Sequence, residues 1–528
     1  MLLINIRWPQ LANQIDPLLE KISLVTSASS KSMSLKGPEN EQAAVLLEES
    51  ASPNTSVADT TSQLLRPGVS KSCFIAFLVA AMMAIAGLVF INTDQTYIMV
   101  DILDYPRDKV GSAAGTLAFA DEILSVFMVS IWGALSDKIA RRWVFGIGLA
   151  CMALAITLHP WASCVFPHTF VSFFRSLLFF RLIFAMGGSA STAMLTALIG
   201  DYAKETSRAK VAGITGIATG LGALFSALVL SRLPTFFARD SNLVPGGLRN
   251  IPNGGATLVI AFAIAGSLLF FSALIAMAFL YSPPELELPR ENLALRTRIK
   301  IGVTAIRRPP IALAYFSSFV ARADSIALTL FISPWVDKFM TQQGRCPSVG
   351  DSNVLTRCQP AKKLASTLMS VVHLSMLLGA PFFGILADRI GAINTIAIPA
   401  GSGLVAFGLL YFLSDPSKPL VYMTMALSGL AVIGMIITSM SLMAALSTPE
   451  HRGALSGVYS FFGAIGIIVT SQLGGYLFDR VKETASFLIV AFSSGIVCFL
   501  AIIIGIHVRN SMNQSAITIE TRDCSVLI

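Results

Sequence analysis

The chain has 528 residues, of which 54% are hydrophobic and only 13% are charged, and its formal net charge is +8. Charged residues make up about a quarter of a typical soluble protein, so this composition excludes a protein with a wholly aqueous surface. The basic residues flank long apolar runs, which is typical of a polytopic membrane protein in contact with a lipid bilayer and argues against nucleic acid as a partner.

Before the first apolar run, residues 1–72 are polar and rich in Ser, Thr and Glu, and they predict a disordered cytoplasmic tail without a cleavable signal. A membrane-spanning helix needs roughly 20 apolar residues. Twelve such runs follow in chain order: 74–97, 112–134, 143–163, 174–200, 209–230, 257–281, 311–336, 365–387, 393–413, 419–445, 453–475 and 486–507. The sequence therefore predicts an all-α membrane protein with twelve transmembrane helices.

One short signature stands between the second and third runs and again between the eighth and ninth. The two copies carry the following residues: Gly133, Asp137, Arg141 and Arg142 in the first, and Gly384, Asp388 and Arg389 in the second. A second marker recurs in the same order, as Glu205 with Arg208 and as Glu450 with Arg452. The halves are therefore parallel copies, an internal repeat that is known from transporters.

The repeat predicts two six-helix bundles with short flanking segments. The expected divisions are an N-terminal bundle over 73–281, a cytoplasmic linker over 282–310, a C-terminal bundle over 311–507 and a cytoplasmic tail over 508–528. Basic residues in the short loops and the linker place the signature side in the cytoplasm by the positive-inside rule. The opposite side has one long loop after the seventh run, to which we assign Lys338, Arg345, Arg357, Lys362 and Lys363.

The same long loop contains two cysteines, Cys346 and Cys358, which this topology places outside or in a lumen. Such a compartment is oxidising, so the pair forms either a disulfide or two free thiols. The remaining cysteines and the scattered histidines show no metal-ligand spacing, and the sequence predicts no metal site and no cofactor.

Ionisable residues inside apolar runs are the candidates for a substrate or proton pathway, because an unpaired charge at the bilayer centre costs at least ~2.5 kcal/mol. These candidates are Asp121, Glu122, Arg181, Arg322, Asp324 and His373. Each has a structural alternative, namely a salt bridge between helices or, for His373, a hydrogen bond between helices. Asp94, at the end of the first run, is either interfacial or functional.

Helical geometry separates some of these candidates. Asp121 and Glu122 are adjacent and point about 100° apart, so at most one of them faces a central pathway. Arg322 and Asp324 are two residues apart and do not form a pair on one face. Arg322 therefore needs an acidic partner elsewhere, and we expect Asp121, Glu122 or an anionic group of the substrate.

From residue 72 to about 508 the chain resembles the major facilitator superfamily. The signature between its second and third helices reads approximately G-x-L-a-D-r-x-G-r-r, and Gly133 to Arg142 match it except at Ala140; the second copy lacks the last basic residues. The resemblance implies that the signature residues form a cytoplasmic gate, in which Gly permits close helix approach and Asp accepts hydrogen bonds. Arg181 resembles the fourth-helix arginine of antiporters, but the fifth-helix antiporter motif lacks its proline, so the subfamily stays open.

This resemblance implies a secondary active transporter that moves a small-molecule substrate by alternating access. No nucleotide-binding loop occurs in the sequence, so the driving force is a gradient, and intramembrane carboxylates are compatible with proton coupling. No pattern indicates an enzyme. An uncoupled uniporter and a non-transporting sensor or receptor on the same scaffold are the alternatives. The plasma membrane and a vacuolar or vesicular membrane are both compatible, and the substrate, the direction of transport and the oligomeric state stay open.

Overall fold

The computed structural model describes residues 64–103, 105–136, 139–162, 170–204, 207–238, 255–281, 295–346, 358–447 and 452–525. Within these ranges the chain is almost entirely helical. The predicted disordered tail lies outside the described residues up to residue 63, and so do Asp137, Glu205 and Glu450 of the two sequence markers.

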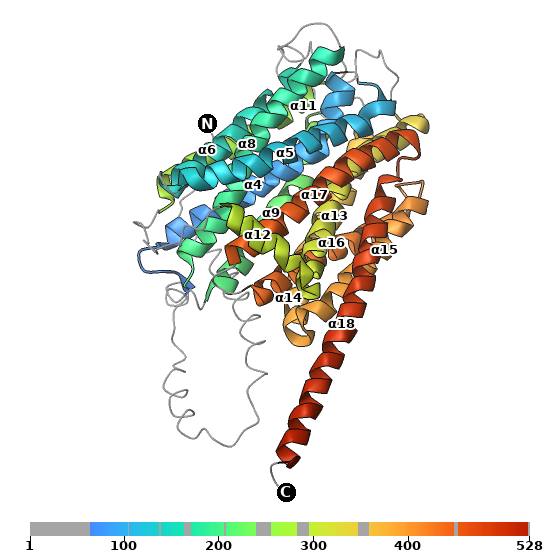
Figure 1. The fold of residues 1–528 in the computed structure, drawn as a ribbon. Helices are drawn as coiled ribbons and strands as arrows, with labels where there is room; N and C mark the ends of the chain where they lie inside the picture. The colour runs from blue at the N-terminus through green and yellow to red at the C-terminus, as the bar shows by residue number, and fades with distance from the viewer. Residues whose placement is uncertain are drawn as a thin grey trace, which may run out of the picture. The chain divides into compact units, whose positions relative to one another are not determined.

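Among the described residues, twelve helices are long and apolar enough to cross a membrane, which confirms the predicted fold class (Figure 1). Their bounds are α4 Lys71–Tyr97, α5 Val110–Ser136, α6 Arg141–Leu158, α8 Phe170–Tyr202, α9 Arg208–Leu228, α11 Gly255–Phe279, α13 Pro309–Gln342, α14 Gln359–Ile390, α15 Ala392–Phe412, α16 Pro419–Leu446, α17 Arg452–Arg480 and α18 Ser486–Ser525. A helix satisfies every backbone hydrogen bond within its own segment, and this is what an apolar solvent demands of a spanning element.

Shorter helices extend or connect these spans. They are the π-helix η1 Ile98–Ile102, the 3₁₀ helices η2 Arg107–Lys109, η3 His159–Trp161, η5 Leu230–Arg232 and η9 Ala305–Arg307, and the α-helices α10 Leu233–Phe237 and α12 Leu295–Thr304. The last of these, α12, lies in the predicted linker. At the other end of the chain α18 continues as one helix through Ser525, beyond the predicted end of the last span (Figure 1).

The long loop predicted after the seventh run is shorter than expected, and the assignment of Lys338, Lys362 and Lys363 to it was wrong. The first of these residues lies on α13 and the other two lie on α14. Lysine is a good helix former, so a helix continues through charged residues beyond its apolar run. Pro360 occupies the first turn of α14, where its missing N–H costs no hydrogen bond.

Two compact units divide the chain, one made of Met1–Lys71 with Ile199–Gly213 and the other of Ser72–Leu198 with Ile214–Ile528. In the first unit an antiparallel bridge joins Leu65 to Ala203, and the Arg66 side chain donates a hydrogen bond to the Ala203 carbonyl oxygen at 3.1 Å. The second unit contains most of both helical halves and is the one that carries the candidate site.

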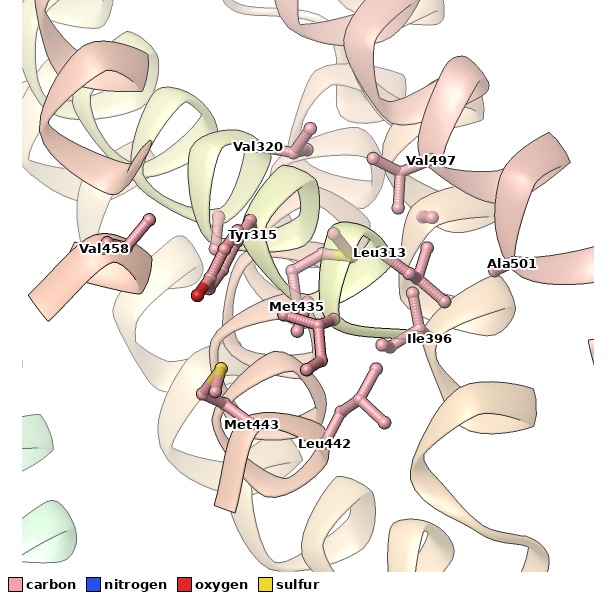
Figure 2. Packing of buried hydrophobic residues seen from close by; sticks show 14 of the residues in the cluster. Leu313, Tyr315, Val320, Ile396, Met435, Leu442, Met443, Val458, Val497 and Ala501 are labelled. Atoms are coloured by element: carbon pink, nitrogen blue, oxygen red, sulfur yellow. The ribbon is translucent and has the colours of Figure 1, made fainter. Parts of the chain in front are cut away.

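Helices of each half pack through small residues, as is usual where lipid supplies no hydrophobic drive for helix association. In the N-terminal half α6 packs against α11, and in the C-terminal half α15 packs against α16 and α18. Figure 2 shows a buried apolar cluster of the C-terminal half, to which Leu313, Met435 and Val497 contribute from α13, α16 and α18. This packing fixes the rotation of α13 and so decides which of its side chains face the N-terminal half.

Candidate substrate pathway and gate

The two halves meet in a layer of charged residues at one end of the spans, which we call the disulfide end. Here Cys346 and Cys358 form a disulfide that links the end of α13 to the start of α14. Lys362, in the first turns of α14, forms an ion pair with Asp101 of the N-terminal half at 2.6 Å, and both side chains are 1% exposed. Arg107 forms a second pair across the halves, with Asp337 of α13 at 2.9 Å.

Local structure explains how Asp101 reaches this layer. The last turn of α4 widens into the π-helix η1, in which the Leu103 N–H donates to the Ile98 carbonyl oxygen at 3.1 Å. Such widened turns redirect side chains and occur often at functional positions. The Lys362 ammonium also lies 5.0 Å from the centre of the Tyr97 ring, one turn earlier on α4, which adds a cation–π contact.

Backbone contacts between α5 and α17 close the same end. The carboxylate of Asp479 accepts hydrogen bonds from the backbone N–H groups of Gly111 and Ser112 at 3.0 and 2.7 Å. A Cβ atom added to Gly115 would lie 2.1 Å from the Ser471 carbonyl oxygen, so only glycine fits there. In this conformation the disulfide end is therefore closed by ion pairs and by direct helix contact.

The opposite end carries the repeated signature, and we call it the motif end. A Cβ atom added to Gly133 or Gly384 would meet nothing within 4 Å, so neither glycine serves a close helix approach in this conformation. Asp388 and Arg389 are exposed. In the first copy, Arg141 donates to the Ala197 carbonyl oxygen of α8 at 3.1 Å.

Two further gate candidates, Arg208 and Arg452, begin α9 and α17. Arg142, next to Arg141, stacks on the Trp143 ring at 5.5 Å. A locking role for these residues at the motif end stays a prediction.

Midway along the helices, three polar residues of the N-terminal half are joined by hydrogen bonds. Arg181 of α8 is 2% exposed, and its guanidinium donates hydrogen bonds to the Asp121 carboxylate of α5 and to the Asn92 side-chain oxygen of α4. It also lies 5.7 Å from the Phe184 ring. Arg181 and Asp121 thus neutralise each other within one half, as in the structural alternative to a substrate role.

The residue that follows Asp121 faces elsewhere. Glu122 of α5 is within electrostatic reach of Arg322 of α13, in the other half. Arg322 is exposed although it lies near the middle of its helix, and its Cγ lies 3.0 Å from where a Cβ atom of Gly463 on α17 would be. The described residues provide no ion pair for Arg322, so its guanidinium is available to a ligand.

Two other candidates, Asp324 and His373, lie away from Glu122 and Arg322. Asp324 is fully buried inside the C-terminal half, with Ser494 of α18 beside it. His373 of α14 is also buried, and neither of its ring nitrogens has a hydrogen-bond partner among the described residues. The structure therefore brings together Glu122 with Arg322, and Asp121 with Arg181, but not all six candidates.

The charged layer at the disulfide end was missed by sequence reasoning. Asp101, Arg107, Asp337 and Lys362 stand near the ends of apolar runs, where charged residues are normally solvated and carry no signal. Only their opposite signs at the same predicted end of neighbouring helices could have indicated pairing.

The architecture of twelve spans in two repeated halves, with opposed charges between them, defines a membrane transporter. The chain belongs to the Major Facilitator Superfamily, whose sequence model matches residues 72–471 and again 359–518. This result confirms the resemblance seen in the sequence.

Individual relatives are distant. Magnetosome protein MamH from Paramagnetospirillum magneticum is 23% identical over 396 residues, which cover 74% of this chain and 83% of that protein. Among solved structures, the nucleoside transporter NupG (D323A mutant) has a TM-score of 0.59 at 16% identity and covers 81% of this chain and 99% of its own. The D-xylose-proton symporter has a TM-score of 0.59 at 14% identity, with 81% and 96% coverage. These two structures are similar to the chain in fold alone.

Proposed function

We propose that this transporter moves a small solute by alternating access, and that Arg322 binds an anionic group of the solute. The observation that carries the proposal is the exposed guanidinium of Arg322 near the middle of a membrane-spanning helix, which forms no ion pair with any residue that the structure describes. A charge at that depth is stable only if it faces water, a counter-charge or a ligand. The side chain stands against Gly463 of α17 and within electrostatic reach of Glu122 of α5, so it faces the other half rather than lipid.

The surroundings of Arg322 also support a second binding function. Glu122 offers a carboxylate on the opposite half, suited to a cationic or hydrogen-bond-donating part of the solute or to a transported proton. Tyr459 of α17 is within electrostatic reach of Arg322, and its hydroxyl makes a 2.7 Å hydrogen bond with Ser439 of α16. We therefore expect a solute with an anionic group and further polar groups.

The test is uptake and efflux by the purified protein in proteoliposomes, screened over solute classes with and without an imposed pH gradient. We expect flux of an anionic or zwitterionic solute, and gradient dependence would distinguish coupled transport from uniport. Arg322→Ala should abolish this flux, whereas Arg322→Lys should keep part of it, because lysine retains the charge without the planar pair of donors.

Arg307→Ala is the matched control, since Arg307 is exposed on the linker. Normal flux by Arg322→Ala would contradict the proposed site. Absence of flux for every solute class would favour a sensor on the same scaffold.

A further inference from the structure

The charged layer at the disulfide end contains more buried acid than base. Three carboxylates belong to it, those of Asp94, Asp101 and Asp337, and all three side chains are nearly inaccessible. In the part of the chain that the structure describes, two cations, Lys362 and Arg107, are paired with them. One carboxylate is therefore in excess, in a region where each uncompensated ion costs several kcal/mol.

The hydrogen bonds show the same imbalance. One oxygen of each of the three carboxylates is buried without a hydrogen-bond partner among the described residues, and so is the side-chain oxygen of Gln95. These four atoms are acceptors, and among the described residues they outnumber the Tyr97 hydroxyl and the Arg107 Nη2, which are donors of the same layer that are also buried without a partner. A buried acceptor without a donor loses the hydrogen bond that water gave it. The addition of a proton would turn one of these acceptors into a donor and would remove the excess charge at the same time.

Asp94 is the carboxylate without a cation in contact. One of its oxygens accepts a hydrogen bond from the Ser231 hydroxyl of η5, and the other has no partner. Asp101 and Asp337, in contrast, each contact a cation directly. Asp94 is therefore the carboxylate in excess, whose negative charge no cation in contact neutralises.

The neighbouring elements provide little positive charge to neutralise the Asp94 carboxylate. Lys362 of α14 acts on it from a distance while paired with Asp101, and Tyr97 lies next to it on α4. Arg232, adjacent to Ser231, instead donates to the hydroxyls of Ser366 and Thr367 on α14 at 3.2 and 3.1 Å. No described cation is thus left for Asp94 in the closed layer.

We propose that Asp94 is a proton-binding site of the gate at the disulfide end, and that closure of this gate takes up one proton from the adjoining compartment. In the closed state Asp94 is a neutral carboxylic acid buried between η5 and α14. Opening separates the two ion pairs, admits water and releases the proton from Asp94 to that water. Because the closed state holds one more proton than the open state, closure is favoured at low pH and lost as pH rises.

The experiment measures gate closure directly and needs no substrate, so its result is independent of the proposed transport function. Spin labels are attached to cysteines at Asp108 and Gln343, which are exposed at the disulfide end of the two halves, in the full chain reconstituted in lipid nanodiscs. Cys73, Cys151, Cys164, Cys498 and Cys524 are replaced by serine and the disulfide is kept. Distances between the labels are then recorded from pH 5 to pH 8.

We expect a short distance at pH 5 and a growing population of longer distances towards pH 8. Asp94→Asn carries a permanently neutral side chain of the same shape, so it should keep the short distance at every pH. A wild-type distance that does not change with pH, or an Asp94→Asn variant that keeps the pH response, would overturn the proposal.

Glu483→Gln is the matched control. Partial burial acts to raise the pKa of Glu483, but the hydrogen bond from Lys338 and further contacts hold this pKa below its ordinary value. Glu483 therefore stays ionised from pH 5 to pH 8, and its loss should leave the response unchanged.

A second variant keeps the proposal testable if Asp94→Asn does not fold. Lys362→Met removes one cation, so a second carboxylate is left in excess and closure needs a higher proton concentration. We expect the midpoint of closure to move down by about one pH unit or more. A midpoint that stays in place or moves up would contradict the proposal.

Discussion

The two ends of the helical halves differ in whether their charged side chains are buried or exposed. At the disulfide end, charged side chains from both halves are buried against one another, as in the pair of Asp101 with Lys362. At the motif end, Asp388 and Arg389 are exposed, and the signature glycines have open space beside them. Ion pairs that hold one end shut must be broken when that end opens, whereas solvated residues at the other end are free to form new contacts. Under the alternating access that we propose, opening of the disulfide end would break these pairs while the motif end closes.

A pair of glycines on α5 offers the strongest way to break this comparison. Gly115→Leu should prevent closure of the disulfide end, because any Cβ atom there would collide with the Ser471 carbonyl oxygen. We expect the short distance between labels at Asp108 and Gln343 to disappear at pH 5. The control is Gly133→Leu at the motif end of the same helix, which should leave that distance unchanged. Retention of the short distance by Gly115→Leu would show that the close approach of α5 to α17 is not essential for closure of the disulfide end.

Removal of one ion pair should have a smaller effect. Arg107→Ala leaves the buried Asp337 carboxylate without its partner, and we expect the closed state to lose roughly 1–3 kcal/mol, since Arg107 itself is partly exposed. The same label pair would report this loss as a larger open population. Lys338→Ala removes a pair with Glu483 that lies within one half, so it should change the population little. Equal effects of the two variants would contradict a specific role for pairs between halves.

At the motif end, Asp137→Asn tests the predicted gate. This change removes the charge of the acceptor that the family resemblance implies at the helix junction. A hydrogen bond to a charged group contributes about 1.5–3 kcal/mol, so transport should slow at least about tenfold without loss of membrane insertion. The measurement is flux in proteoliposomes at equal protein level. A normal rate would remove Asp137 from the gate.

The smallest expected effect concerns which end faces the cytoplasm. The tails contain the sequons that begin at Asn54 and Asn513, and cytoplasmic tails cannot be glycosylated. We therefore expect no mass shift on glycosidase treatment of the protein from eukaryotic cells. A shift that disappears in Asn54→Gln would reverse the orientation and place the motif end outside.

Much of the fold was predictable because hydropathy acts locally. Each apolar run has to form its own helix in lipid, so the twelve spans and the two repeated halves follow from the order of residues along the chain. Helical spacing likewise separates Arg322 from Asp324 and Asp121 from Glu122. The lengths of α13 and α14 were harder to predict, because polar residues that extend a helix beyond the membrane resemble loop residues in sequence.

Charge pairing was decided by the tertiary structure alone. Whether Arg181 contacts Asp121, and whether Lys362 contacts Asp101 across 261 residues of sequence, depends on the rotation and tilt of helices that pack through small residues. Those angles arise from the sum of many weak contacts, so no single stretch of sequence encodes them. The sequence by itself thus determined which residues are costly in a membrane, and only the packed helices determined which residues compensate them.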